Sequence, residues 1–209
     1  MDALLPCEPC FSTREINHVS IKIGVFFATK QTPGKSNGEA NLLFTASAAQ
    51  TDHLPFASLL LGTSAHLMEF DASSCAGLYL ISERNILNQP LSELRADQLP
   101  GCVGMFPMIA KPNMDRTAAD QYWRDVHAPL ALEVHSAMTH YYQLTFVHRF
   151  FGPDLDGLAL CCFAHEKDFR ERMYSSAEGK QRIGEDIEKF ADTARSPRKV
   201  VATVRPHTA

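Results

Sequence analysis

Residues 115–144, DRTAADQYWRDVHAPLALEVHSAMTHYYQL, decide the fold that we expect. An N-cap residue and apolar positions at helical spacing predict a helix at the start of this stretch. Pro129 interrupts that helix, so we expect His127 near a helix C-terminus, where unpaired carbonyls favour an imidazolium. A second helical pattern resumes over 130–138, and the residues of 141–147 then predict a strand. A helix, a His-x-Pro corner and a strand therefore form one unit.

Two separated parts of the chain resemble the EthD family. The first, residues 122–130, YWRDVHAPL, resembles its motif of an aromatic-Trp pair followed by His-Ala-Pro-Leu. The second lies downstream and consists of 175–179, SSAEG, followed by 186–190, DIEKF. The resemblance covers 101–206 and reaches only faintly into the first hundred residues. It implies an α+β, ferredoxin-like fold of the dimeric α/β barrel type, with one βαββαβ unit per domain.

The composition is that of an ordinary globular protein. The 209 residues are 45% hydrophobic and 21% charged, which argues against wholesale disorder. A net charge of -4 gives no reason to expect nucleic acid or an anionic membrane as partner. The first residues lack the basic start and apolar run of a secretory signal, and no stretch has the length of a membrane-spanning helix. We therefore expect a cytoplasmic protein.

The cysteines and the catalytic motifs argue against metal and cofactor chemistry. Of the six cysteines, Cys7 and Cys10 have CxxC spacing, but the others offer no matching second pair of zinc ligands. There is no GxSxG elbow, no P-loop and no GxGxxG motif after a strand. We expect neither a metal nor a cofactor, which leaves cofactor-free acid–base chemistry as the natural enzyme class.

The first half of the chain carries weak matches to the second half. His53 aligns with His127 at a shift of 74 residues, and the same shift places His66 on a second histidine. Residues 77–80, GLYL, match 157–160, GLAL, after a short insertion. The shared order of these matches predicts a tandem repeat with a degenerate first copy.

We accordingly divide the chain into an N-terminal arm (1–17), a degenerate ferredoxin-like repeat (18–100) and an EthD-like domain (101–209). The two βαββαβ repeats are expected to stack so that their sheets face each other. Helical segments are expected at 41–62, 91–97 and 166–195. Strands are expected at 19–28, 66–70, 77–81, 102–110, 140–150, 157–163 and 199–204.

His127 is the first candidate for chemistry. Its reference pKa near neutrality suits proton transfer, whereas the alternative is a structural histidine that fixes the corner before Pro129. We expect Trp123 to pack the helix against the sheet in preference to contacting a ligand. His53 and His66 are candidates only through the repeat.

The strand over 140–150 offers two further sets of polar side chains, one on each face. His140, Tyr142 and His148 share one face, and Tyr141 and Gln143 share the other. A pocket between two facing sheets would suit a flat apolar ligand, and the sequence leaves open which set lines it. The candidate catalytic residues are His127, Tyr142 and His140. The candidate substrate-binding residues are Trp123, Tyr141, His53, His66, Gln143 and His148.

Two functions from different classes follow. The first is a cofactor-independent lyase, isomerase or cyclase that acts on an aromatic or polyketide-like compound, as the family resemblance implies, with His127 as acid/base and a tyrosine of the strand polarising an oxygen. The second is a non-catalytic protein that binds a hydrophobic ligand or supports an oxygenase. We also expect a homodimer, because a shortened first repeat should leave sheet edge or face uncovered.

Overall fold

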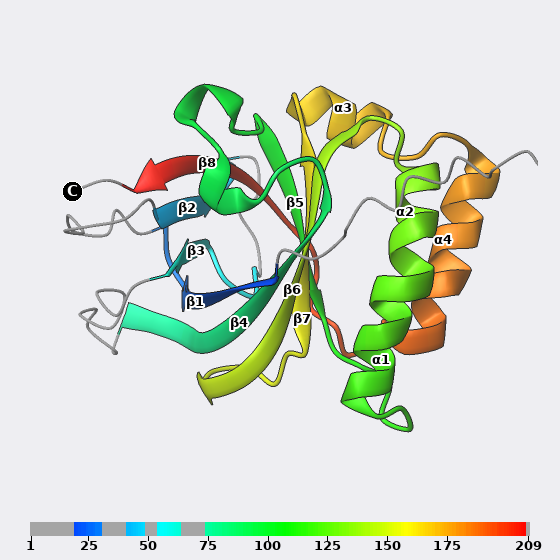
Figure 1. Ribbon diagram of the computed structural model, residues 1–209, viewed down its shortest axis with the longest axis horizontal. Coiled ribbons are helices and arrows are strands. Elements are labelled where there is room, and N and C mark those ends of the chain that lie inside the picture. The colour runs from blue at the N-terminus through cyan, green and yellow to red at the C-terminus, as the bar shows by residue number, and fades with distance from the viewer. Residues whose placement is uncertain (1–18, 31–40, 49–53, 64–73, 208–209) are drawn as a thin grey trace, which may run out of the picture.

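The computed structural model describes residues 19–30, 41–48, 54–63 and 74–207 (Figure 1). Eight strands form a closed antiparallel barrel, and helices of the second half cover one side of it. The strands are β1 (Val19–Phe27), β2 (Asn41–Ala46), β3 (Ser58–Gly62), β4 (Cys75–Leu87), β5 (Cys102–Met108), β6 (Met138–Phe151), β7 (Gly157–Phe163) and β8 (Val200–His207). The helices are α1 (Arg116–Tyr122), α2 (Ala128–Val134), α3 (Glu166–Glu171) and α4 (Ala177–Phe190), with a π-helical turn, η5 (Trp123–His127), between α1 and α2 and short 3-10 turns at η3 (Leu91–Glu93) and η4 (Ala96–Gln98).

Both halves of the chain contribute to one barrel. The strands follow one another around it in the order β1-β3-β2-β8-β5-β7-β6-β4. The halves meet at two antiparallel seams, β2 with β8 and β4 with β6. Closure gives each of these eight strands two neighbours, so none of them is an edge strand. The prediction of an α+β barrel is confirmed, and the barrel closes within a single chain.

The second half follows the element order β5, α1–α2, β6, β7, α3–α4, β8. The helical region predicted over 166–195 consists of two helices, α3 and α4. Ser176 is the N-cap at which α4 begins, and its side chain accepts a hydrogen bond of 2.9 Å from the Gly179 backbone N–H. Ile183 and Phe190 lie on the buried face of α4, as their spacing predicted.

The prediction of a helical segment over 41–62 is wrong. Strands β2 and β3 lie there, and between β1 and β4 the described residues contain no α-helix. The reason is burial on both faces: Leu42 and Phe44 point into the barrel, whereas Leu43 packs on its outer side. A short apolar run of this kind has no two-residue alternation, so it resembles a buried helix as much as a buried strand.

The residue alignment proposed between the two halves is also wrong. Residues 77–80 belong to β4, the fourth strand of its half, whereas 157–160 belong to β7, the third strand of the other. Similarly, His127 lies in a helical turn, whereas the segment after position 53 leads into β3. The strand predicted at 66–70 lies outside the described residues.

Packed side chains fill the barrel, where we had expected a pocket between facing sheets. The ring of Phe26 lies 5.2 Å from that of Tyr79, which lies 4.5 Å from that of Phe146. Eight strands enclose a space that side chains can fill completely. The inward-facing apolar residues include Phe26, Leu59, Tyr79, Met105, Tyr142, Leu144, Phe146 and Leu160, all buried. The interior of this barrel is therefore a core.

Candidate functional site

A π-helical turn carries His127. The backbone stays in the right-handed helical region from Tyr122 through His127 to Ala128, and the Ala128 N–H donates to the Trp123 carbonyl, five residues earlier. In a regular α-helix the ring of Pro129 would clash with the carbonyl four residues before it, and the wider turn relieves this clash. The prediction that His127 lies at a helix C-terminus is therefore wrong, and no helix dipole favours its protonation.

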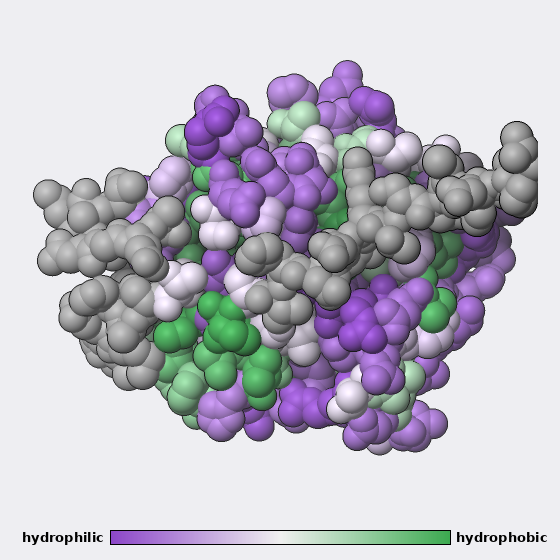
Figure 2. All heavy atoms as spheres, viewed as in Figure 1, coloured by the Kyte–Doolittle hydropathy of each residue, from purple (hydrophilic) through white to green (hydrophobic). Residues whose placement is uncertain are grey.

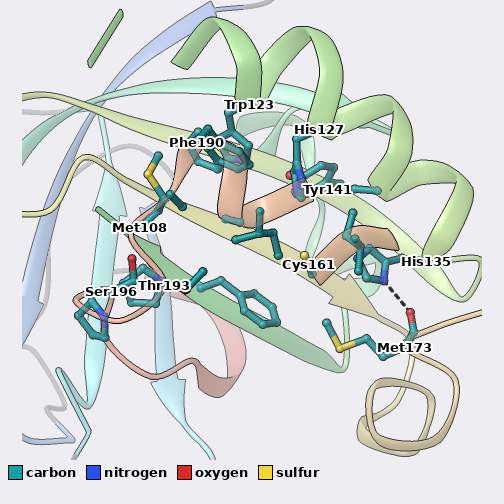
Figure 3. A pocket seen from close by; sticks show the side chains of 18 of the residues that line it. Met108, Trp123, His127, His135, Tyr141, Cys161, Met173, Phe190, Thr193 and Ser196 are labelled. Atoms are coloured by element: carbon teal, nitrogen blue, oxygen red, sulfur yellow. Dashed lines mark hydrogen bonds between the residues drawn. The ribbon is translucent and has the colours of Figure 1, made fainter. Parts of the chain in front are cut away.

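The outer face of the sheet and the helices that cover it enclose a cavity of about 230 Å³ (Figure 3). Its floor comes from β5, β6 and β7, and its roof from η5, α2 and α4. Most of the lining is apolar, including Phe106, Trp123, Met173, Ile183, Ile187 and Phe190. A few polar groups interrupt it, chiefly His127, His135 and Tyr141. An apolar cavity with a few convergent polar groups is the usual form of a small-molecule site.

Trp123 fixes the helix against the floor of this cavity. Its side chain is buried and lies over β7, where a Cβ added to Gly157 would stand 2.7 Å from the indole Cζ3. The glycine thus leaves room for the indole. Trp123 serves as helix-to-sheet packing, as predicted, and also lines the cavity.

Asp186 holds the imidazole of His127. The His127 Nδ1–H donates to Asp186 Oδ2 over 2.9 Å, and both side chains are largely buried. The other carboxylate oxygen accepts a hydrogen bond of 2.7 Å from the Tyr122 hydroxyl. The Phe190 ring lies 5.1 Å from the imidazole ring. Because a carboxylate can only accept, Nδ1 carries the proton and Nε2 keeps its lone pair.

The charges at this pair favour a neutral imidazole. Burial lowers the pKa of His127, and the opposing effect of Asp186 does not fully offset it. Burial acts to raise the pKa of Asp186, but hydrogen bonds from Tyr122 and His127 outweigh it and hold that pKa below its usual value. At neutral pH the site therefore presents an unprotonated base supported by a carboxylate.

A hydrogen-bond relay orients the hydroxyl of Tyr141. Arg84 Nη1 donates to Gln143 Oε1 over 2.5 Å, and Gln143 Nε2 donates to the Trp123 carbonyl over 2.9 Å. A guanidinium can only donate and a carbonyl can only accept, so these partners fix the orientation of the amide. The same Nε2 also donates to Tyr141 Oη over 3.3 Å. The tyrosine O–H has no acceptor among the described residues and is free to donate to a ligand.

The relay is anchored at its far end by Asp120. Its carboxylate pairs with Arg84 over 2.8 Å and accepts a hydrogen bond of 2.6 Å from Thr145. Burial raises the pKa of Tyr141 well above its usual value, so the phenol remains protonated. Tyr141 is therefore a hydrogen-bond donor at any ordinary pH.

The structure brings His127, Trp123, Tyr141 and Gln143 together and separates them from Tyr142 and His140. Tyr142 points into the barrel, where its hydroxyl donates to the Gln89 carbonyl over 2.8 Å.

The other predicted histidines lie away from this cavity. His140 stacks on the Tyr142 ring at 6.2 Å and contacts Asn88. His148 is exposed on the far part of β6. His53 and His66 lie outside the described residues.

Sequence reasoning missed Asp186 and His135. Asp186 lies on the buried face of α4 between Ile183 and Phe190, and a carboxylate on an apolar helix face is a signal that could have identified it. His135 follows His127 by eight residues on the cavity side of the same helical segment. The spacing gave no clear signal, because eight residues at 3.6 per turn leave two side chains offset by about a quarter of a turn and not on one face.

Cys161 lines the cavity but is not a nucleophile. Burial raises its pKa to about 12, so the thiol stays protonated at neutral pH. Within the described ranges, no three His, Cys, Asp or Glu side chains are grouped as a metal site would require. No helix in the described part of the chain is long and apolar enough to span a membrane.

The buried histidines predict how stability depends on pH. Burial lowers the pKa values of His127, His135 and His140. The unfolded chain therefore binds more protons than the folded protein between the lowered values and the ordinary value of about 6.5. We expect the free energy of unfolding to fall as the pH is lowered from about 7.5 to about 5.5, above the range where carboxylates titrate.

Thermal unfolding at a series of pH values within that window measures the effect. Replacing His140 with Asn should make the dependence shallower, because one depressed group is removed. A thermal midpoint that rises towards pH 5.5 would contradict the burial of these rings in their neutral form.

Comparison with known proteins finds a family match over the segment that carries His127 and Asp186. Residues 111–194 match the family model described as EthD domain, which confirms the resemblance over that part of the chain. No curated protein matches the sequence. A crystal structure described as a "putative monooxygenase" from Lactobacillus acidophilus NCFM superposes with a TM-score of 0.45 and 10% identity, over 91% of this chain and 94% of that chain.

Proposed function

We propose that this protein is a cofactor-independent enzyme of the lyase, isomerase or cyclase type, acting on a small aromatic or polyketide-like compound. The observation that carries the proposal is one apolar cavity whose wall holds both a base and a hydrogen-bond donor. The base is His127 Nε2, supported by Asp186, and the donor is the Tyr141 hydroxyl. The EthD match over 111–194 supports a role in small-molecule metabolism.

The chemistry that these groups favour is proton transfer next to a carbonyl or phenol oxygen. His127 Nε2 takes a proton from the ligand carbon, and the electron pair of that C–H bond moves towards the oxygen. The Tyr141 hydroxyl donates to that oxygen as its negative charge grows. Asp186 stabilises the imidazolium that forms, and Nε2 then returns the proton to the ligand at the same or another atom.

The alternative is a protein that binds a hydrophobic ligand without changing it. The same apolar lining would serve it, but a purely apolar carrier has no need of a buried carboxylate behind a cavity histidine. Asp186 accepts the Nδ1 proton of His127 and so leaves Nε2 free towards the cavity, an arrangement that favours a chemical role for His127. The exchange experiment below separates the two functions.

Exchange of the acidic C–H protons of 2-tetralone in D2O, followed by proton NMR, tests the proposal. This flat ketone offers one carbonyl oxygen to Tyr141 and protons on the adjacent carbon to His127. We expect the protein to accelerate the exchange above the buffer background, because abstraction needs only a base and an oxygen donor. Binding of 2-tetralone without any acceleration would favour the carrier function instead.

We further propose that the two halves of the chain, 18–100 and 101–209, are copies of one unit. Around the barrel the first half runs β4-β1-β3-β2 and the second β8-β5-β7-β6, so each half has the order fourth, first, third, second. This shared order supports a tandem ferredoxin-like repeat in a register other than the one the sequence matches indicated. The arm at 1–17 lies outside the described residues.

The homodimer and the cytoplasmic location stay predictions. Closure of the barrel removes the uncovered sheet edge that motivated the dimer. Exposed apolar side chains still favour it, and Figure 2 shows apolar surface over the region where Figure 1 places β1 and β4. The exposed apolar residues include Ile21 of β1 and Val147 and Phe150 of β6.

A further inference from the structure

We infer that His135 is a second ligand-binding group of the cavity, whose Nε2 accepts a hydrogen bond from a hydroxyl or amine of the ligand. The inference rests on the proposed function only in taking this cavity as the ligand site. It adds a requirement on the ligand: a hydrogen-bond donor at the end that lies away from His127.

The backbone fixes which nitrogen of His135 is free. Nδ1 lies 2.7 Å from the carbonyl oxygen of Met173, in the segment between α3 and α4 (Figure 3). Because a carbonyl can only accept, Nδ1 must carry a proton. The Tyr174 ring, 5.3 Å away, packs against the imidazole and holds its plane. In the neutral ring the lone pair is then on Nε2.

That lone pair has no protein partner. His135 is only 6% exposed, and its one hydrogen bond to the described residues is made by Nδ1. Nε2 is not among the fully buried polar atoms that lack a partner, so it stays open to a water-sized group. Since His135 lines the cavity, a ligand or a water molecule there can donate to Nε2.

The two histidines present acceptors to one apolar cavity. His127 and His135 lie at the two ends of α2, and both line the cavity with an Nε2 that carries no proton in the neutral ring. The rest of the lining is largely apolar and includes aromatic side chains such as Trp123 and Phe190. We therefore propose a flat arene with two hydrogen-bond donors as the ligand class, and take a two-ring arene as the probe.

Calorimetric binding of two matched probes tests this inference. The probes are 2,6-dihydroxynaphthalene, with a donor at each end, and 6-methoxy-2-naphthol, which has the same ring system but one donor. A single hydrogen bond contributes about 0.5–1.5 kcal/mol, so we expect the unaltered protein to bind the diol roughly 2- to 13-fold more tightly. The ratio of the two binding affinities should fall to about one in His135→Leu and in His135→Phe. The phenylalanine variant keeps a ring beside Tyr174.

A second measurement keeps the test decisive if either variant folds poorly. In nitrogen-15 NMR spectra of the unaltered protein, Nε2 of His135 should resonate as an unprotonated ring nitrogen and shift when the diol is added. An equal preference for the diol in a folded His135 variant, no preference in the unaltered protein, or a protonated Nε2 would each overturn the inference. The protein could also prefer the diol but fail to accelerate the exchange of 2-tetralone. That result would support His135 as a binding group and reject only the catalytic proposal.

Discussion

Replacing His127 with asparagine should lower turnover of the physiological substrate by roughly 10²–10⁴-fold, the usual contribution of one general acid or base. On 2-tetralone the exchange rate should fall to the buffer background. Asparagine keeps hydrogen bonding to Asp186 but cannot accept and release a proton at neutral pH. The buried pair should therefore stay satisfied, and the thermal midpoint should change little. Full exchange activity in a stable His127→Asn protein would exclude this histidine as the base.

A companion variant tests how His127 is oriented. Asp186→Asn keeps the shape of the side chain, but its amide can donate to Nδ1 and so favours the tautomer that carries the proton on Nε2. We expect exchange activity to fall and its pH profile to change, because no carboxylate then stabilises the imidazolium. Asp125→Asn is the matched control, since Asp125 lies two residues from His127 but pairs with Arg124 on the surface. It should leave the exchange rate unchanged.

The barrel interior predicts the largest effect on stability. Tyr79 is fully buried there, its ring packs against Phe26 and Phe146, and its hydroxyl donates to the Pro153 carbonyl over 2.7 Å. Tyr79→Ala would remove these contacts and leave a void, which typically costs about 3–5 kcal/mol for a large aromatic residue. In a chain of this length that loss lowers the thermal midpoint by about 6–20 °C.

The control for Tyr79 is an exposed aromatic residue. Phe150 is 50% exposed, so Phe150→Ala should change the free energy of unfolding by no more than about 0.5 kcal/mol. Chemical denaturation of both variants measures the difference. If Tyr79→Ala were as stable as Phe150→Ala, the barrel interior would not be a packed core, and a ligand pocket inside it would again have to be considered.

The local pattern of the second half predicted most of its elements, although it missed the break between α3 and α4 and the π-helical turn at His127. Helix capping and apolar spacing place the helices, and the aromatic run places β6. In the first half, strands buried on both faces lack alternation, so residues 41–62 resembled a helix. The sequence also does not predict which side of the sheet each residue of β6 occupies. Alternation along the strand places Tyr141 and Tyr142 on opposite faces, but it does not say which face the helices cover. The partners Asp186 and Met173 come from distant parts of the chain, and only the fold brings them to His127 and His135.

We propose that the chemistry takes place in the cavity under the helices and not inside the barrel. Adjacent residues on opposite faces of β6 test it most directly, through 2-tetralone exchange and thermal unfolding of Tyr141→Phe and Tyr142→Phe. Tyr141→Phe should lose most of the exchange activity and keep its thermal midpoint. Tyr142→Phe should keep the activity and unfold at a lower temperature, because the bond to the Gln89 carbonyl is lost. Loss of exchange in Tyr142→Phe, with full activity in Tyr141→Phe, would instead place the reaction inside the barrel.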